Sequence, residues 1–300
     1  MTKGAQAEGR LGNIVSMVRE EFVCDPIKDA ALGVVEKPLT KWERVYNFGA
    51  LRKLFIILVL AATWQAYAMW LGKGLLLPTL TATANALWVN VASGELLRRA
   101  WFSISVLLMG YGLGVALAGL FTAIAVSSRI GADFLETMTS MLNPLPAIAL
   151  LPLALIWFGL GNGSMIFVLV HSVLWPVALN AHTGFRSVSN TLRMVGRNAG
   201  LRGARYIVSI LIPAASGSIL SGLKIGWAFA WRTLIAAELV FGATSNSGGL
   251  GWFIYVSKNE LEIANVFAGL LTIILIGLFV ENVIFRNIEL MTVKKWGMQN

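Results

Sequence analysis

The sequence predicts an all-α protein that crosses a membrane about six times, and three observations carry this prediction. Of the 300 residues, 57% are hydrophobic and 13% are charged, whereas soluble globular domains are close to half apolar and a quarter charged. The mean hydropathy is +0.72. Apolar stretches near or above the roughly 20 residues of a transmembrane helix recur along the chain. This composition excludes a sheet-rich soluble enzyme and a disordered chain.

Six stretches fit transmembrane helices, and the longest apolar run divides into two of them. Leu142–Phe185 contains no charge but is too long for one helix, and the glycine cluster at 158–163 is typical of a tight turn. The predicted spans lie within Leu54–Leu71, Ala100–Val126, the two parts of Leu142–Phe185, Tyr206–Gly242 and Ile263–Phe285.

The chain outside these spans is short. Apolar side chains at helical spacing predict an amphipathic helix at 11–23, which fits the membrane surface, a soluble partner or an ordinary surface position. Leu77–Thr79 predicts a turn that leads into a short outer helix at 84–91. The predicted parts are an N-terminal segment 1–53, a transmembrane region 54–286 with a cytoplasmic loop at about 186–213, and a C-terminal tail 287–300.

The basic residues predict the orientation. Eighteen Lys and Arg residues fall in 1–53, a loop at 127–133, 186–205 and 286–300, all on one side of six spans, against four on the other side. Loops rich in Lys and Arg face the cytoplasm, so both termini are predicted to be cytoplasmic in a multi-pass inner-membrane protein. We therefore interpret the basic residues behind the net charge of +9 as determinants of membrane orientation, and we expect no nucleic-acid partner. No apolar run precedes residue 54, so no cleavable signal peptide is expected.

Small residues and prolines mark where helices pack or bend. The second span carries small residues at four-residue spacing, which lets two helices approach closely, either within one chain or across a dimer. The fifth span repeats this pattern. Three prolines in the third span predict a bent or partly unwound helix, which is tolerated where neighbours or a cavity satisfy the freed backbone groups. These residues are Gly110, Gly114, Ala118 and Thr122, then Gly222, Gly226 and Ala230, then Pro144, Pro146 and Pro152.

The residues for several catalytic chemistries are missing from the sequence. It has no Gly-x4-Gly-Lys-Ser/Thr loop to hold phosphates, so this chain is not expected to hydrolyse ATP. Cys24 is the only cysteine, which excludes a disulfide framework within the chain and a Cys-based zinc site. His171 and His182 share a face of one span, with Trp175 between them, but lie roughly 16 Å apart along the axis. We expect them to form a packed or cavity-facing stripe, with no metal site.

Three charges fall inside the fifth span. Lys224 lies near the expected cytoplasmic end and fits a snorkelling side chain. Arg232 and Glu238 lie deeper, and an ionisable group in a span is a functional candidate. Six residues separate them, about 240° around a helix, so we expect them not to pair with each other. Water, a substrate or a second subunit would then be the partner of each. Arg232 fits either a structural bond between helices or a pathway for anions. The candidate pathway residues are Arg232, Glu238, His171 and Trp175.

The loop after the fourth span predicts a docking element. Its pattern indicates a helix, a glycine break, a second helix with basic residues on its exposed side, and a proline that opens the fifth span. A short helix that projects from a membrane bundle fits a groove on a soluble partner. The residues expected to form it are Arg197, Ala199, Gly200, Leu201, Arg202, Arg205, Ile210 and Pro213.

This loop resembles the signature of inner-membrane permease subunits of ATP-binding cassette (ABC) importers. That signature is Glu-Ala-Ala, three residues, Gly, nine residues, Ile-x-Leu-Pro. Gly200, Ile210 and Pro213 stand at the matching positions, and Ile212 replaces leucine. Met194-Val195-Gly196 stands where Glu-Ala-Ala is expected, so the usual contact of the first helix is open to question.

Other segments resemble the nitrate, sulfonate, taurine and bicarbonate branch of these permeases. The resemblance runs from about Leu77 to the C-terminus and leaves residues 1–50 outside. The matching segments, in chain order, are Leu151-Pro152-Leu153, Trp157-Phe158-Gly159, Gly222-Leu223-Lys224, Ala236-Ala237-Glu238-Leu239 and Gly248-Gly249-Leu250-Gly251.

The resemblance implies a type I ABC importer permease fold and a set of partners. These are a second permease subunit, most simply in a homodimer, two cytoplasmic ATPases that bind ATP and Mg, an external solute-binding protein, and membrane lipid. The chain itself is expected to have no catalytic residue and no cofactor. Arg232 fits a small anionic solute such as a sulfonate, nitrate, bicarbonate or an organic or aromatic carboxylate. The alternatives are an ion channel or an ATP-independent transporter, which leave the docking loop without a role, and an intramembrane enzyme, for which no catalytic constellation is found.

Overall fold

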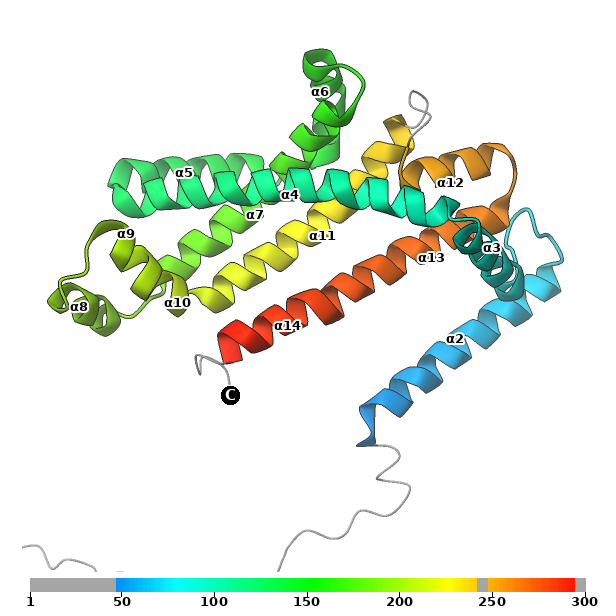
Figure 1. Ribbon diagram of the computed structural model, residues 1–300, viewed down its shortest axis with the longest axis horizontal. Coiled ribbons are helices and arrows are strands. Elements are labelled where there is room, and N and C mark those ends of the chain that lie inside the picture. Colours follow the sequence, from blue (N-terminus) through cyan, green and yellow to red (C-terminus); the bar gives the residue numbers. More distant parts are fainter. Residues whose placement is uncertain (1–46, 242–247, 295–300) are drawn as a thin grey trace, which may run out of the picture. The chain divides into compact units, whose positions relative to one another are not determined.

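A computed structural model describes residues 47–241 and 248–294, and all regular structure within these ranges is helical (Figure 1). The amphipathic helix predicted at 11–23 lies outside the described residues. By its contacts the chain separates into residues 1–58 and 59–300, and the packing described below belongs to the second unit. The longer helices are α2 (Gly49–Leu71), α3 (Leu80–Ala92), α4 (Glu95–Ser127), α5 (Arg129–Leu142), α7 (Asn162–Arg186), α11 (Ser216–Phe241), α12 (Leu250–Asn259) and α13 (Ile263–Phe279).

Shorter helical pieces connect or extend these helices. They are η2 (Ala147–Leu150), α6 (Leu151–Phe158), α8 (Asn190–Asn198), α9 (Gly203–Tyr206), the π-helical turn η3 (Ile207–Leu211), α10 (Ile212–Ala214), the π-helical turn η4 (Val280–Phe285), α14 (Arg286–Glu289) and the π-helical turn η5 (Leu290–Lys294).

Within the described residues, four helical stretches are long and apolar enough to cross a membrane. The number of possible spans rises to six if each of two bent helix pairs is counted as one span. The four are α2, α4, α7 and the continuous segment Ile263–Thr292. They correspond to the predicted first, second, fourth and sixth spans. The last one continues past its predicted end at Phe285, because the helix runs on through α14 and η5.

The third predicted span differs from the observed structure. The loop expected at 127–133 is absent from the described chain: only Ser128 separates α4 from α5, and its hydroxyl caps α5 by accepting from the Gly131 amide at 3.0 Å. The chain then bends by 88° between α5 and the α6 segment. Pro144 and Pro146 lie in that break, whereas Pro152 lies in the first turn of α6, where its missing N–H needs no partner. The predicted bend is therefore confirmed, but it falls at the start of the predicted span.

The long helix of the fifth span begins later than the predicted start at Tyr206. Residues Gly203–Ala214 are helical and meet α11 at 78°. Pro213 lies in the first turn of α10, so the proline precedes the bend and does not open the span itself. The long helix α11 begins at Ser216 and carries all three charges that the sequence places inside this span.

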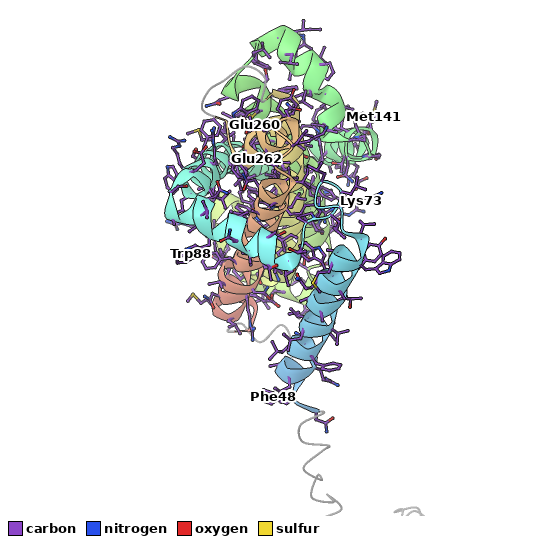
Figure 2. All side chains as sticks on the ribbon, turned by 90° about the vertical axis from the view of Figure 1, so that its right-hand side faces the viewer. Phe48, Lys73, Trp88, Met141, Glu260 and Glu262 are labelled. Atoms are coloured by element: carbon purple, nitrogen blue, oxygen red, sulfur yellow. The ribbon has the colours of Figure 1, made fainter. Side chains whose placement is uncertain are left out.

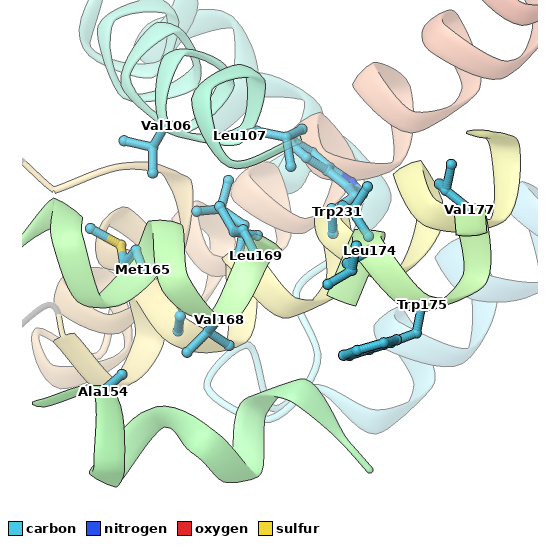
Figure 3. Packing of buried hydrophobic residues seen from close by; sticks show 14 of the residues in the cluster. Val106, Leu107, Ala154, Met165, Val168, Leu169, Leu174, Trp175, Val177 and Trp231 are labelled. Atoms are coloured by element: carbon cyan, nitrogen blue, oxygen red, sulfur yellow. The ribbon is translucent and has the colours of Figure 1, made fainter. Parts of the chain in front are cut away.

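Helices α4, α7 and α11 form the core of the second unit. In Figure 3, Val168 and Leu169 of α7 lie between Val106 of α4 and Ala154 of α6, and all four are buried. Glycines allow the helices to approach closely. A Cβ at Gly114 would lie 2.7 Å from the Cβ of Val173, and one at Gly222 would lie 2.7 Å from the Cβ of Asn180. The small-residue stripes of both spans therefore serve packing within one chain, on α7.

This packing predicts a position-specific effect of leucine on α4. Gly114→Leu is expected to lower the free energy of unfolding by about 1–3 kcal/mol, because the new side chain collides with Val173 in a packed core. Gly112→Leu is the matched control: Gly112 is two residues away on the same helix, and a Cβ there meets nothing within 4 Å. Denaturant unfolding of both variants in detergent measures the difference. Equal stability of the two variants would contradict the assignment of this stripe to the α4–α7 contact.

Helices α3, α12 and α13 pack together beside the start of α4 (Figure 1). Thr79 caps α3 by accepting from the Ala82 amide at 3.2 Å, which confirms the turn and short helix predicted there. Asn90 of α3 donates to the Asn265 side chain of α13 at 2.9 Å. Outside the core, apolar side chains cover the surface: Trp88 on α3 and Met141 on α5 are 72% and 65% exposed (Figure 2). Such a surface is typical of helices that face lipid.

Candidate functional site

A cavity of about 420 Å³ lies between α7, α11 and the break that follows α5. This volume falls in the range of small-molecule pockets, roughly 300–1,000 Å³. The bend at residues 143–146 forms the third wall of the cavity. If the third span were straight, this proline-containing segment would not lie beside α7. Residues from 142–148, from 171–176 of α7 and from 229–236 of α11 line it.

Three of the four predicted pathway residues meet at this cavity: His171, Trp175 and Arg232. His171 and Trp175 are four residues apart on α7 and therefore share a face, with ring centroids 6.2 Å apart in an edge-to-face arrangement. Both ring nitrogens of His171 and the Nε1 of Trp175 are buried and have no hydrogen-bond partner among the described residues. Buried polar atoms are almost always paired, so such atoms at a cavity wall require an explanation.

Arg232 is the cation of this cavity. Among the described residues that line it, none is acidic and Arg232 alone carries a fixed charge. Its guanidinium makes no hydrogen bond or ion pair with another described residue. Arg232 also borders a second cavity, of about 290 Å³, together with Lys224 and Glu281, but no Glu281 oxygen lies within ion-pairing distance. Lys224 instead donates to Glu289 at 2.6 Å, an ion pair where the sequence indicated only a snorkelling side chain.

Glu238 lies apart from that cavity, and its partners are different from those expected. Its carboxylate accepts from the Ser103 hydroxyl at 2.7 and 2.9 Å and from the Gly251 amide at 2.8 Å. Glu238 is 2% exposed. The expected absence of a Glu238–Arg232 pair is confirmed. The expectation that water, a substrate or a second subunit would be the partner of Glu238 was wrong, because α4 and α12 of the same chain supply it.

Segment 248–251 is shaped by this carboxylate. Ser103 accepts from the Leu250 amide at 2.9 Å, and Arg99 donates to the Gly248 carbonyl at 2.9 Å. A Cβ at Gly251 would lie 2.6 Å from the Cβ of Glu238, and one at Gly249 would collide with Ser103 and Glu238. The glycines let α12 begin directly on the carboxylate, which a helix N-terminus stabilises. We call Arg99, Ser103, Glu238 and segment 248–251 the α12 clasp.

His182 lies near the C-terminal end of α7. It lines a polar cavity with Glu136 of α5 and Arg186 of α7, which form an ion pair. The two histidines therefore border different cavities, although both lie on α7. Within the described ranges, no three His, Cys, Asp or Glu side chains lie close enough together to hold a metal ion.

The predicted docking loop is a helix, a tight turn and a second helix. Helix α8 ends in two backbone bonds: the Leu201 amide donates to the Gly196 carbonyl at 3.1 Å, and the Gly200 amide donates to the Arg197 carbonyl at 3.0 Å. This is the pattern of a glycine-closed helix end, and Gly200 has the left-handed φ of 73° that it requires. A Cβ at Gly200 would meet nothing within 4 Å. The turn is therefore open to a partner.

The predicted residues of the loop fall on two sides. The turn and its basic neighbours face outward, whereas Leu201, Ile210 and Pro213 are half-buried. Arg193 attaches α8 to the end of α7 by donating to the Phe185 carbonyl at 2.6 Å and the Val188 carbonyl at 3.1 Å. The exposed members are Arg197, Ala199, Gly200, Arg202 and Arg205.

Comparison with known proteins places the chain in a family. The profile of the "Binding-protein-dependent transport system inner membrane component" family matches residues 114–289, which is more than half of the chain. The chain belongs to this family. The match covers the cavity, the loop and the part of the α12 clasp that lies on α11 and α12, and it confirms the resemblance that the sequence carries. As a member of a permease family, the chain is a membrane transport component and not an enzyme.

Individual ABC permeases show the same similarity over most of their length. A putative ABC transporter permease of Methanocaldococcus jannaschii is 30% identical over 222 residues, 73% of this chain and 82% of its own. The putative aliphatic sulfonates transport permease SsuC of Escherichia coli is 29% identical over 225 residues, 74% and 84% of the two chains. The nitrate import permease NrtB of Synechocystis is 28% identical over 248 residues, 80% and 88% of the two chains.

In this ABC permease the first loop helix has a structural reason for departing from Glu-Ala-Ala. Gly196 is buried, and a Cβ there would lie 3.0 Å from Ile210 and 3.1 Å from Tyr206. The glycine lets α8 lie directly against the second helix. Met194 and Val195 are more than half exposed, so the altered residues present apolar side chains outward beside the turn.

Sequence reasoning missed two residues of this permease. Ser103 is one of many serines, and no local signal marks it as the partner of a glutamate 135 residues away. Arg193 was counted only as a basic loop residue. Its position four residues after the Ser189 cap of α8, within reach of the carbonyls at the end of α7, was the available signal.

Proposed function

We propose that this chain is the transmembrane subunit of an importer that moves a small anion from an external solute-binding protein to the cytoplasm. A cavity between spanning helices, with Arg232 as the fixed charge among its described lining residues, supports this proposal. The names of its relatives agree with it, since they include an aliphatic sulfonate permease and a nitrate permease. Both termini would then be cytoplasmic, as the distribution of basic residues predicts.

Separate ATPase subunits would supply the energy through the loop at about 186–213. The exposed turn at Gly200 would enter a groove on each ATPase, and the surrounding arginines would add a salt-sensitive attraction, modest for each exposed pair. Closure of the ATPases around ATP and Mg would open the pathway outward, and hydrolysis would return it inward. A second copy of this chain would complete the pathway. Residues 54–286 would form the transmembrane region, between the segment 1–53 and the tail 287–300.

The proposal predicts that transport requires this chain, the ATPase, ATP and the solute-binding protein together. The test is uptake of radiolabelled nitrate and alkanesulfonates into proteoliposomes that hold this chain together with the ATPase and the solute-binding protein of the same importer. The complete assembly is expected to accumulate at least one of these anions, and uptake should fall at least tenfold when ATP or the binding protein is omitted. The chain alone is expected to hydrolyse no ATP, since it has no phosphate-binding loop.

The control is the same assembly with an ATPase whose phosphate-binding lysine is replaced. Uptake by this chain alone, at the rate of the complete assembly, would contradict the proposal and favour a channel or an ATP-independent transporter.

A further inference from the structure

We propose that the cavity at Arg232 is a solute-binding site of the permease itself, and that it selects organic anions with a compact apolar body over small inorganic anions. The ligand would carry a sulfonate or carboxylate head and a body about the size of a phenyl ring or a short alkyl chain. This inference rests on the proposed function in one respect: the imported solute passes through this subunit.

One cation, Arg232, is available to bind the head group of such a ligand. Arg232 has no partner among the described residues, and the guanidinium fork matches the paired oxygens of a carboxylate or sulfonate. Thr233, the next residue on α11, also lines the cavity and can add a hydroxyl donor. None of the described lining residues is acidic, so no carboxylate of the wall competes for the guanidinium or repels the ligand.

The remaining wall fits an apolar body. Of the fifteen lining residues, ten are apolar, and they include Pro144, Pro146, Ile148 and Phe229. The volume of about 420 Å³ is far larger than nitrate or bicarbonate needs. A small inorganic anion would leave the apolar wall in contact with water. An apolar ligand body would displace this water and gain roughly fourfold in affinity for each buried methylene.

Unpaired polar atoms at the same wall point to a bound ligand as well. Trp175 is 6% exposed, and its Nε1 and both nitrogens of His171 have no hydrogen-bond partner among the described residues. These atoms are shielded in this structure, and the proposed ligand would reach them only after the rings turn. A Trp N–H only donates, and a neutral His both donates and accepts. The oxygen atoms of a sulfonate or carboxylate would accept hydrogen bonds from these rings. They would do so next to Arg232, the only fixed charge among the described lining residues.

The test is direct binding to the full chain in lipid nanodiscs, measured by calorimetry with benzenesulfonate, hexanesulfonate, methanesulfonate and nitrate. Benzenesulfonate and hexanesulfonate are expected to bind at least about tenfold more tightly than methanesulfonate or nitrate, because their bodies bury apolar surface. Equal affinity for nitrate and benzenesulfonate would overturn the proposed selectivity.

Two variants connect this binding to the cavity. Arg232 is itself exposed, so Arg232→Gln is expected to weaken benzenesulfonate about tenfold, the lower end of the range for a hydrogen bond to a charged group. Arg98→Gln removes the same charge from a side chain that is 71% exposed and outside the cavity, and should change the affinity less than twofold. Ala236→Leu narrows the cavity, so it should weaken benzenesulfonate far more than methanesulfonate. Equal effects of Arg232→Gln and Arg98→Gln would overturn the site.

Failure of this inference can be told from failure of the proposed function. ATP-driven uptake by the complete assembly, with none of the four probes bound by the chain alone, would overturn the binding site and leave the function standing. Selective binding that depends on Arg232, without ATP-driven uptake, would support the site and count against the proposed function. The melting temperature of each variant in nanodiscs shows that lost binding is not lost folding.

Discussion

Glu238→Leu is expected to cause the largest loss of stability of any single substitution in the α12 clasp. Leucine removes the acceptor of both the Ser103 hydroxyl and the Gly251 amide, which lie 2.7 and 2.8 Å from the carboxylate. A buried donor left without a partner costs about 1–3 kcal/mol, and two are created here. The free energy of unfolding should fall accordingly, and hydrogen exchange of the amides of α12 should accelerate.

Three further variants give this prediction its controls. Glu238→Gln keeps one acceptor oxygen and should be milder than Glu238→Leu, in both stability and uptake. Ser103→Ala should fall between them, since it removes the hydroxyl but leaves the bond to the Gly251 amide. Glu260→Leu makes the same replacement at an exposed position that ends α12 and should be nearly neutral. If Glu238→Leu unfolds at the same denaturant concentration as Glu260→Leu, the clasp does not hold α12.

The second large effect is expected at Gly200, in the turn of the docking loop. A residue with a Cβ pays about 1–2 kcal/mol to adopt the left-handed conformation of this position, although the space around it is open. Gly200→Trp also places a bulky ring on the surface that would enter the ATPase. We expect co-purification of the ATPase to fall at least tenfold. Gly200→Ala should still assemble, with less solute imported per ATP hydrolysed.

Two variants separate backbone strain from bulk at this position. Gly200→Asn should retain assembly and uptake, because asparagine tolerates the left-handed conformation. Gly72→Trp is the matched control for bulk: Gly72 also has a positive φ, 62°, with nothing within 4 Å of a Cβ, but lies in the connection between α2 and α3. Its effect on ATPase binding should be negligible. Normal assembly and uptake by Gly200→Trp would show that this turn is not the coupling element.

The sequence predicts the apolar spans better than the helices that border them. Helices α4, α7 and α13 are confirmed because long uncharged stretches determine them. Helix α5 was missed because it carries Arg129, Asp133 and Glu136, and a hydropathy criterion rejects such a helix. Its charged face has a role that only the fold shows, the ion pair of Glu136 with Arg186 of α7.

In the candidate site, too, the sequence predicts some features and not others. Arg232, His171 and Trp175 were identified because charged and polar residues are unusual in spans, and two of them share a helical face. Their meeting at one cavity depends on the break at 143–146 lying beside α7, which no local pattern contains. The glycines at 248–251 were recognised as a motif, but their reason is steric and becomes visible only when Ser103 and Glu238 occupy the space that a Cβ would need.

The close approach of α4, α7 and α11 limits how this protein can move. A Cβ added at Gly110, Gly114 or Gly226 would come within 3 Å of a side chain on α7, so sliding any of these helices by one residue would force larger side chains into the glycine gaps. This packing therefore favours movement of the three helices together over sliding of one past another. The two bends, 88° after α5 and 78° before α11, lie outside this packing and would be the places where the chain can rearrange. One of them borders the cavity and the other joins the docking loop to α11. If a partner pushes on this loop, as proposed, the movement would reach the cavity wall as a rotation at the bends and not as a sliding of packed surfaces.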